Sequence, residues 1–309
     1  MVAVDGNTLL SLVSRGDPAI VGTPYGYVPT QWVTIMFVVL FSISALVHTG
    51  QLIYFRTWWM IPTVILCGGL EILGWSARLW SSISPQMSNP FTIQITATII
   101  GPTPLVAANF IILGRIIRRL GPAYSRLSPR WYARLFLGCD IISLVIQAVG
   151  GAMASIAGGN NEDPAPGGHI MLGGIIFQMV TITIYAISAA EFFLRYRKNA
   201  PISPDRTVEG KPYVMRANMT SDLKTMSFAL VFSTCILFIR SIYRTAELID
   251  GWSGVIITTE VYFNLFDGAM IVLAIYTLNF AHPGRLLVGD SGPQEDEKVS
   301  QLNSRSSSV

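Results

Sequence analysis

The sequence predicts an all-α polytopic membrane protein, a bundle of seven transmembrane helices with its N-terminus outside and its C-terminus in the cytosol. Composition is the first observation: the 309 residues are 51% apolar and 13% charged, whereas soluble domains carry about 25% charged residues. The second is a series of apolar runs of about 20 residues, the length that crosses a bilayer core of about 30 Å. The third is the placement of basic residues on alternate links between these runs.

The apolar runs define the predicted helices. In order, they lie at about 31–53, 59–79, 92–114, 134–156, 169–193, 224–248 and 258–281. The sixth run is the weakest by hydropathy, because arginines interrupt it. We therefore expect an extracellular or lumenal tail at 1–30 and a transmembrane domain at 31–287. Residues 288–309 are Gly, Ser, acidic and polar, which predicts a disordered cytosolic tail.

The charges on the links set the predicted orientation. The links after runs one, three and five and the segment after run seven are basic. In that order, their Lys and Arg residues are Arg56; Arg115, Arg118, Arg119, Arg126, Arg130 and Arg134; Arg195, Arg197, Lys198, Arg206, Lys211, Arg216 and Lys224; and Arg285. The other links carry no charge or only acids, namely Glu162, Asp163 and Asp250. Basic loops stay in the cytosol. A count of seven runs is needed for this alternation to stay in phase.

The sequence lacks the residues that metal-dependent enzymes and nucleotide-driven proteins need. The three cysteines fall inside apolar runs, and the histidines, His48, His169 and His282, are too scattered for a convincing zinc site. The sequence has no nucleotide-binding motif. We therefore expect no enzymatic activity, no cofactor or metal and no nucleic-acid partner.

Charged residues inside the runs are the main candidates for a site, because each costs about 2.5–3.5 kcal/mol to insert into lipid. They are Glu71 and Arg78 in run two, Arg240, Arg244 and Glu247 in run six, and Glu260 and Asp267 in run seven. Within each run the spacing places them on one helix face. The orientation places these four acids and three arginines in the outer half. They could form a structural ion-pair network or a polar cavity open to the outer leaflet, with one acid left for a cationic headgroup.

A second polar set is expected in the inner half. Asp140 and Gln147 lie seven residues apart on run four, and Asn109 of run three is a candidate partner. Gly101-Pro102-Thr103-Pro104 should kink or break run three. That break could serve helix shape alone or free carbonyl groups at membrane depth. Gly150-Gly151 and Gly173-Gly174 permit close helix packing.

Several short motifs occur in order along the chain. They are Tyr25-Gly26-Tyr27-Val28-Pro29; His48 with Gln51; Glu71-x-x-Gly74-x-x-x-Arg78; Gly114-Arg115; Pro129-Arg130-Trp131; Asp140 with Gln147 and Gly150-Gly151; Arg240-Ser241-x-x-Arg244-x-x-Glu247; Glu260 with Phe266-Asp267; and His282-Pro283-Gly284. This order resembles the fungal RTA-like family, also called lipid-translocating exporters. The resemblance covers the chain except its tails. One departure is that the family often has a proline after the Phe-Asp pair, where this chain has Gly268.

The resemblance implies a seven-helix fungal membrane protein that translocates or exports lipids or cationic amphiphiles such as sphingoid long-chain bases. Such activity would contribute to tolerance of toxic amphiphiles. The expected ligands are membrane lipids or amphiphilic small molecules, and the expected location is the plasma membrane, with internal membranes as the alternative. A receptor-like lipid or stress sensor without transport activity stays open, although the chain lacks the outer cysteine pair and the Asp-Arg-Tyr of rhodopsin-like receptors. A membrane organiser that alters lipid distribution indirectly is a third reading.

Overall fold

The computed structural model describes residues 23, 25–160, 162–202, 217–251 and 254–288. Most of the predicted N-terminal tail and nearly all of the tail at 288–309 therefore lie outside the described residues. The described part is all-helical, and seven of its helices are long and apolar enough to cross a membrane. The predicted fold class is confirmed to that extent.

Several spans consist of more than one helical element. The elements are α2 (Gln31–Phe55); η1 (Trp58–Met60), η2 (Ile61–Ile65) and α3 (Leu66–Ile83); α4 (Ser88–Ile100) and α5 (Pro102–Leu120); η3 (Pro122–Tyr124); α6 (Pro129–Gly159); α7 (Ala165–Lys198); α8 (Ser221–Asp250); α9 (Glu260–Phe263), η4 (Asn264–Ala269) and α10 (Met270–Phe280); and α11 (Pro283–Val288). The segments η2 and η4 are π-helical. Such segments are rare and frequently mark functional sites.

Some helices extend well beyond the apolar runs that predicted them. The run at 92–114 lies within a span from Ser88 to Leu120, and the run at 169–193 lies within α7, Ala165–Lys198. Hydropathy detects only the part of a helix in hydrocarbon, whereas the helix continues into the headgroup region with charged residues such as Arg118 and Arg119. Beyond α7, Asn199 adopts the left-handed conformation that commonly ends helices.

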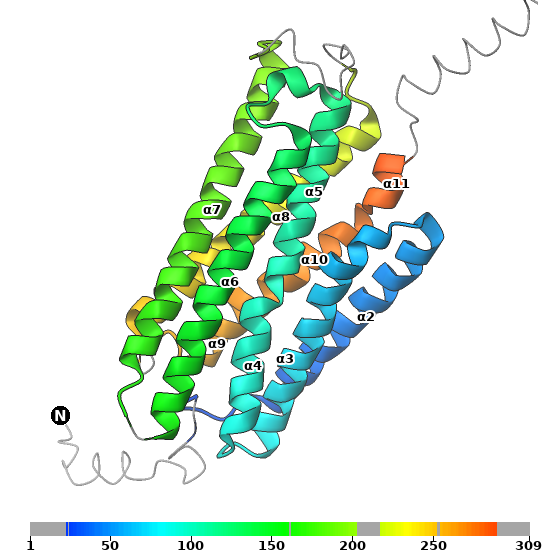
Figure 1. The fold of residues 1–309 in the computed structure, drawn as a ribbon. Helices are drawn as coiled ribbons and strands as arrows, with labels where there is room; N and C mark the ends of the chain where they lie inside the picture. The colour runs from blue at the N-terminus through cyan, green and yellow to red at the C-terminus, as the bar shows by residue number, and fades with distance from the viewer. Residues whose placement is uncertain (1–22, 24, 161, 203–216, 252–253, 289–309) are drawn as a thin grey trace, which may run out of the picture.

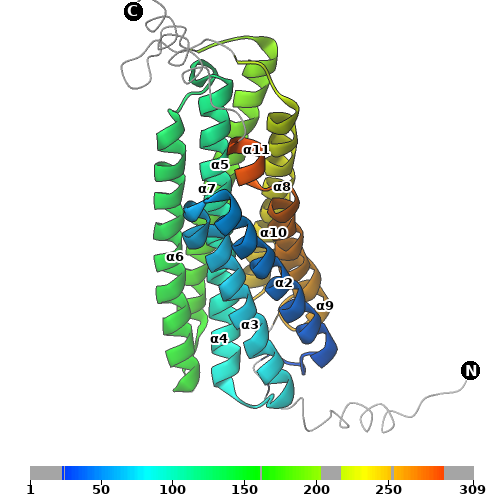
Figure 2. The ribbon, with the colours of Figure 1, turned by 90° about the vertical axis from the view of Figure 1, so that its right-hand side faces the viewer.

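The third span is at the centre of the bundle. Of its apolar stretch, 72% is buried, against 28% for the fourth span. Around it, packing contacts run from α2 to α3, from α3 to α4, from α5 to α6, and on through α7 and α8 to α10, which returns to α2. Figures 1 and 2 show α6 and α7 side by side along their length, with α2, α3 and α10 on another side of α5. Groups on α4 and α5 can therefore reach several spans at once.

Close contact between α6 and α7 depends on glycine. A Cβ atom on Gly150 would lie 2.3 Å from the backbone nitrogen of Met171, and one on Gly174 would lie 2.7 Å from Cγ of Gln147. Small residues at these two positions let the helices approach. Gly151 and Gly173, also predicted as packing residues, make no such close approach.

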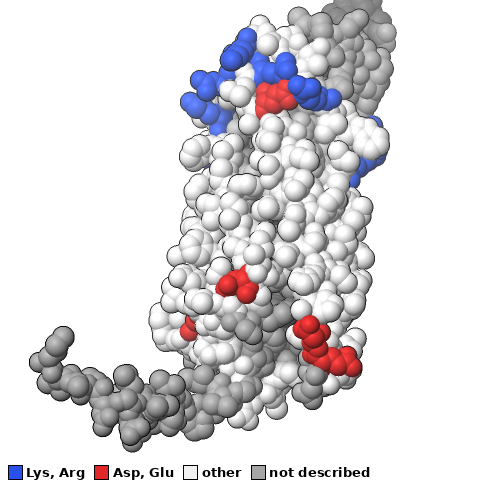
Figure 3. Space-filling model, turned by 90° about the vertical axis from the view of Figure 1, so that its left-hand side faces the viewer, with Lys and Arg blue, Asp and Glu red and all other residues white. Residues whose placement is uncertain are grey.

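The two ends of the bundle differ in charge, as Figure 3 shows. One end, here called the basic end, carries the links that follow α2, α5 and α7 and the helix α11; its described basic residues include Arg118, Arg119, Arg126, Arg130, Arg195, Arg197, Lys198 and Arg285. The acidic end carries the links before α2, α4, α7 and α9, with Glu162, Asp163 and Asp250. Each span therefore crosses from one charge environment to the other.

Candidate functional site

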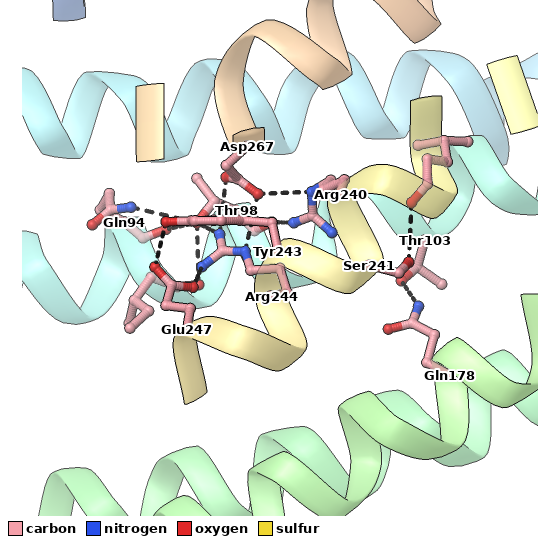
Figure 4. A network of polar contacts seen from close by, with 12 residues as sticks. Gln94, Thr98, Thr103, Gln178, Arg240, Ser241, Tyr243, Arg244, Glu247 and Asp267 are labelled. Carbon is pink, nitrogen blue, oxygen red and sulfur yellow. Dashed lines mark hydrogen bonds and ion pairs between the residues drawn. The ribbon is translucent and has the colours of Figure 1, made fainter. Parts of the chain in front are cut away.

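Three charged residues of α8 point into the bundle. Arg240, Arg244 and Glu247 are all buried, at 8%, 5% and 2% exposure. Their spacing of four and three residues puts them on one face of the helix. That face looks toward α4 and the seventh span, as Figure 4 shows. A buried charge needs partners, and the neighbouring spans supply them.

Asp267 is the acid that both arginines share. Its Oδ1 lies 2.7 Å from Arg240 Nε, while Arg244 donates from Nε to Oδ1 and from Nη2 to Oδ2, each at 2.9 Å. This two-pronged contact matches the planar guanidinium to the carboxylate. Asp267 is 0% exposed and belongs to η4, so the irregular part of the seventh span carries its most connected acid.

Glu247 completes the α8 part of the site. Arg244 Nη1 donates to its Oε2, and the Tyr243 hydroxyl donates to its Oε1, each at 2.8 Å. Each oxygen therefore has a donor. Arg244 consequently joins two acids, Asp267 on the seventh span and Glu247 on its own helix.

The break in the third span provides further acceptors. Pro102 has no N–H group, so the Thr98 carbonyl lacks its usual helical donor four residues later. Arg240 Nη2 donates to that carbonyl at 2.7 Å, and Arg244 Nη2 donates to the Thr98 hydroxyl at 3.1 Å. Gly101 separates α4 from α5 yet keeps helical torsion angles. The proline motif therefore does more than shape the helix, because it frees a carbonyl that an arginine uses.

A second arginine–acid pair lies nearer the acidic end. Arg78 Nη2 lies 3.4 Å from Glu260 Oε1 and donates to the Tyr27 hydroxyl at 2.7 Å. Glu260 also accepts from the Thr30 backbone N–H at 2.8 Å and from the Thr30 hydroxyl at 2.6 Å. Burial raises the pKa of the Tyr27 phenol. The segment before α2 is thereby attached to the second and seventh spans.

Phe263 joins the two groups of charges. Its ring centroid lies 4.6 Å from Arg78 Cζ and 5.3 Å from Arg244 Cζ, both within the range of cation–π attraction. We call the combined set the ionic cluster. Its members are Arg78, Arg240, Arg244, Glu247, Glu260 and Asp267. The structure thus brings together six of the seven charges predicted for the outer half, and joins them in ion pairs.

The seventh charge, Glu71, has no partner of its own. It is 0% exposed, and neither of its carboxylate oxygens has a hydrogen-bond partner among the described residues. Gly101 makes room for it, since a Cβ atom there would lie 2.6 Å from Glu71 Oε1. The buried indole Nε1 of Trp75, one turn along α3, is a donor close to this carboxylate, but the two groups make no hydrogen bond in this conformation. Glu71 is therefore the acid left over when the arginines have paired.

The second polar set is centred on a residue that the sequence analysis missed. Gln178 on α7 accepts from Gln147 Nε2 at 3.1 Å and donates to the Thr103 hydroxyl at 3.2 Å and to Asp140 Oδ1 at 3.4 Å. Asp140 Oδ2 has no partner. The sequence feature that could have identified Gln178 was its polar amide in the middle of an apolar run.

The predicted partnership of Asn109 with Asp140 and Gln147 is wrong. Asn109 instead donates to the Ser233 hydroxyl on α8 at 3.0 Å. It lies on the side of α5 that faces α8, because α5 is central and has neighbours all round. Asp140 and Gln147 lie where α6 faces α7.

A small cavity separates the ionic cluster from the second polar set. Its volume is about 10 Å³, roughly the space of one water molecule. The residues that line it are Ile99, Gln147, Ile175, Gln178, Arg240, Ser241 and Arg244. In this conformation the cavity beside Arg240 and Arg244 therefore has no room for a lipid headgroup.

The described residues contain no group of three or more His, Cys, Asp or Glu that could hold a metal ion. Two of the histidines that look scattered in sequence do come together at the basic end. The rings of His48 and His282 have centroids 6.2 Å apart, and His48 Nε2 lies 3.2 Å from the Ile275 carbonyl oxygen. Burial, with a smaller effect of Arg285, lowers the pKa of His282 to about 4.

Comparison with known proteins places this geometry in a family. The family described as RTA1 like protein matches residues 64–290. The chain is 29% identical over 307 residues to the sphingoid long-chain base transporter RSB1 of Saccharomyces cerevisiae (strain JAY291), covering 92% of this chain and 80% of that protein. Protein RTA1 of Saccharomyces cerevisiae (strain ATCC 204508 / S288c) is 27% identical over 285 residues, covering 84% of each chain.

A relative from a second organism extends the comparison. The lipid-translocating exporter-like protein RTA1 of Leptosphaeria maculans is 24% identical over 300 residues, covering 91% of this chain and 54% of that protein. No solved structure matches the chain. Two of these relatives are named as a transporter and as an exporter-like protein, which supports a lipid-transport role at the level of the family. The family match covers well over half of the sequence and includes the whole ionic cluster, and the chain therefore belongs to the RTA1-like family.

Proposed function

We propose that this protein translocates lipids or amphiphiles with a cationic headgroup, of the sphingoid long-chain base type, and so contributes to tolerance of toxic amphiphiles. The names of its relatives support the lipid part of this proposal. The observation that carries the headgroup part is Glu71, a fully buried acid beside the ionic cluster with no cation of its own. A cationic headgroup would supply the missing partner.

The ionic cluster has a different role in this proposal. Arg240 and Arg244 hold Asp267, while Arg78 holds Glu260, so these acids are already neutralised. An incoming ammonium group would therefore be drawn to Glu71 rather than to a paired acid. The sequence predicted that one acid would be left for a cationic headgroup, and in this proposal that acid is Glu71. The alkyl chain would stay among the lipid-facing apolar side chains.

The burial of Glu71 implies that the headgroup enters only after the bundle opens. Glu71 is 0% exposed, and the cavity beside Arg240 and Arg244, which Glu71 does not line, has space for about one water. We infer that opening separates spans around Glu71, and the break at Gly101 and the π-helical segment η4 are the irregular backbone nearest to the site. Irregular backbone at membrane depth is tolerated where protein or water satisfies it.

The proposal includes an orientation and a location. Basic loops remain in the cytosol, so the basic end is assigned to the cytosolic side and the N-terminus to the outside. The ionic cluster then lies in the outer half of the membrane. We place the protein in the plasma membrane, where export would remove an amphiphile from the cell.

The test is flux of a fluorescent sphingoid base across proteoliposomes that contain the purified protein. Glu71→Gln keeps the shape of the side chain and removes its charge, and it should abolish flux. Glu162→Gln, the same change at an exposed site of the acidic end, should leave flux unchanged. Equal flux from wild type and Glu71→Gln would sink the headgroup role. Ligand binding without flux from folded wild type would favour the sensor alternative over translocation.

A further inference from the structure

The ionic cluster is electrically balanced without Glu71. Its three arginines pair with its three acids, and every one of those six groups has an ion-pair partner. An ionised Glu71 would add an unmatched negative charge inside the membrane, where such a charge is costly. The groups that face Glu71 from neighbouring spans are Asp267, Arg240 and Arg244, and Cys67 lies one turn before it on α3. Both arginines are already committed to Asp267.

The hydrogen bonds around Glu71, like the charges, favour the neutral form of its carboxyl group. A buried carboxylate persists when donors satisfy its oxygens, as they do for Asp267 and Glu247. Neither oxygen of Glu71 accepts a hydrogen bond in this conformation, and Glu71 has no exposed surface on which water could supply one. The Trp75 indole N–H lies close by, but it is a single neutral donor and brings no positive charge. A carboxyl group in that position is retained in its neutral form.

We propose that Glu71 carries a proton whenever the site is empty and gives up that proton when a cationic headgroup arrives. This inference rests on the proposed function, which supplies the cation. The exchange is balanced: the neutral acid and the cation become a carboxylate–cation pair plus one released proton. The total charge beside the ionic cluster is the same in both states, so Glu71 never remains ionised and unpaired.

This exchange supplies an energy source. On the cytosolic side, headgroup binding releases the proton inward. On the outer side, a proton from outside displaces the headgroup and restores the neutral acid. One cation moves out as one proton moves in, so the cycle moves no net charge and is driven by a medium more acidic than the cytosol.

Proton release can be counted with a ligand that has no proton to lose. A long-chain alkyltrimethylammonium carries a fixed positive charge, so any released proton comes from the protein. We would measure its binding to the purified full-length protein by calorimetry in two buffers of different ionisation enthalpy, across several pH values. The expected result is about one proton released per ligand bound, with Kd rising about tenfold for each unit by which pH falls.

Substitutions of Glu71 test whether the released proton comes from this residue. Glu71→Asp keeps an acid and should keep the release, while Glu71→Gln should lose it, and any weak residual binding should not depend on pH. Glu162→Gln serves as the matched control and should behave as wild type. Release that persists in Glu71→Gln overturns the assignment, because the proton then comes from another acid.

The outcomes separate this inference from the proposed function. Tight binding by wild type with no proton released and a Kd independent of pH overturns proton exchange and leaves translocation standing. Absence of binding by folded wild type overturns both. If Glu71→Gln does not fold, the proton count and the pH dependence of wild type and Glu71→Asp decide the question.

Discussion

In the half of the bundle nearer the acidic end, buried arginines and acids join the second, third, sixth and seventh spans. In the half nearer the basic end, neutral groups join one another, such as Asn109 with Ser233 and Ser44 with Asn279, and the acid Asp140 contacts the amide of Gln178 rather than a cation. Both halves belong to the same helices. The difference shows that the buried ion pairs are concentrated where we place the headgroup, while hydrogen bonds without a cation join the helices in the other half.

Charged and neutral contacts respond differently to a lost partner. A buried ion that loses its partner keeps its charge in a low-dielectric interior, so the cost is large. A neutral amide or hydroxyl that loses its partner costs much less, and in membranes one such hydrogen bond contributes about 0.6 kcal/mol on average. The two halves should therefore differ in sensitivity to substitution, and a set of variants can test this.

The largest effect should come from Asp267→Asn. This change leaves Arg240 and Arg244 facing an uncharged amide, and removal of one partner from a buried ion pair costs about 3–5 kcal/mol. Thermal unfolding of the purified protein, followed by far-ultraviolet circular dichroism, should show a large drop in Tm or failure to fold. Asp267→Glu keeps the charge and should recover part of the loss. Wild-type stability in Asp267→Asn would show that the pairs contribute nothing net.

Acid should introduce a buried positive charge at the basic end. The pKa of His282 is lowered to about 4 by burial, below the ordinary value of 6.5, so folding favours the neutral ring. Stability from this group is present above pH 6.5 and is lost as pH falls through the range toward 4. Tm measured between pH 7 and pH 4 should fall more for wild type than for His282→Asn. The asparagine oxygen can still accept the Gly284 N–H that His282 Nδ1 accepts now. Parallel curves for the two proteins would contradict this prediction.

A smaller effect is expected for Asn109→Ala. The variant loses the hydrogen bond with Ser233, and the expected loss is about 1 kcal/mol, within the range measured for membrane proteins. A double-mutant cycle with Ser233→Ala would isolate the pair. A coupling energy as large as that between Arg240 and Asp267 would erase the contrast between the two halves.

Periodicity and charge in the sequence were enough to predict the residues of the ionic cluster but not their pairing. Arg240, Arg244 and Glu247 share a helix face in any α-helix, so their grouping follows from spacing alone. Which acid stays unpaired depends on how the seventh span turns at η4 and on how closely Glu71 approaches Gly101, and neither is visible in hydropathy. The pairing therefore had to come from the structure.

In the third span, too, the sequence predicted polar groups but not their partners. Proline at position 102 predicts a freed carbonyl, but not that Arg240 of a distant span uses it. Gln178 was overlooked because a single neutral amide barely lowers the hydropathy of a long apolar run. Likewise, Asn109 was assigned to the wrong partner because spacing gives the depth of a residue but not the side of a central helix on which it lies.

The smallest effect on stability is expected for Glu71→Gln, the variant that should abolish flux. An amide has nearly the shape of a neutral carboxyl group, and Glu71 has no hydrogen bond to lose. If the empty site holds a proton, the exchange of neutral acid for neutral amide leaves no buried charge without its partner, so it should lower the free energy of unfolding far less than Asp267→Asn does. Unfolding of Glu71→Gln and Asp267→Asn under identical conditions gives the comparison directly, since both changes replace a buried acid by its amide in the same half of the bundle. A loss in Glu71→Gln as large as in Asp267→Asn would mean that Glu71 is ionised and paired in the empty protein, and proton exchange at this residue would then be wrong.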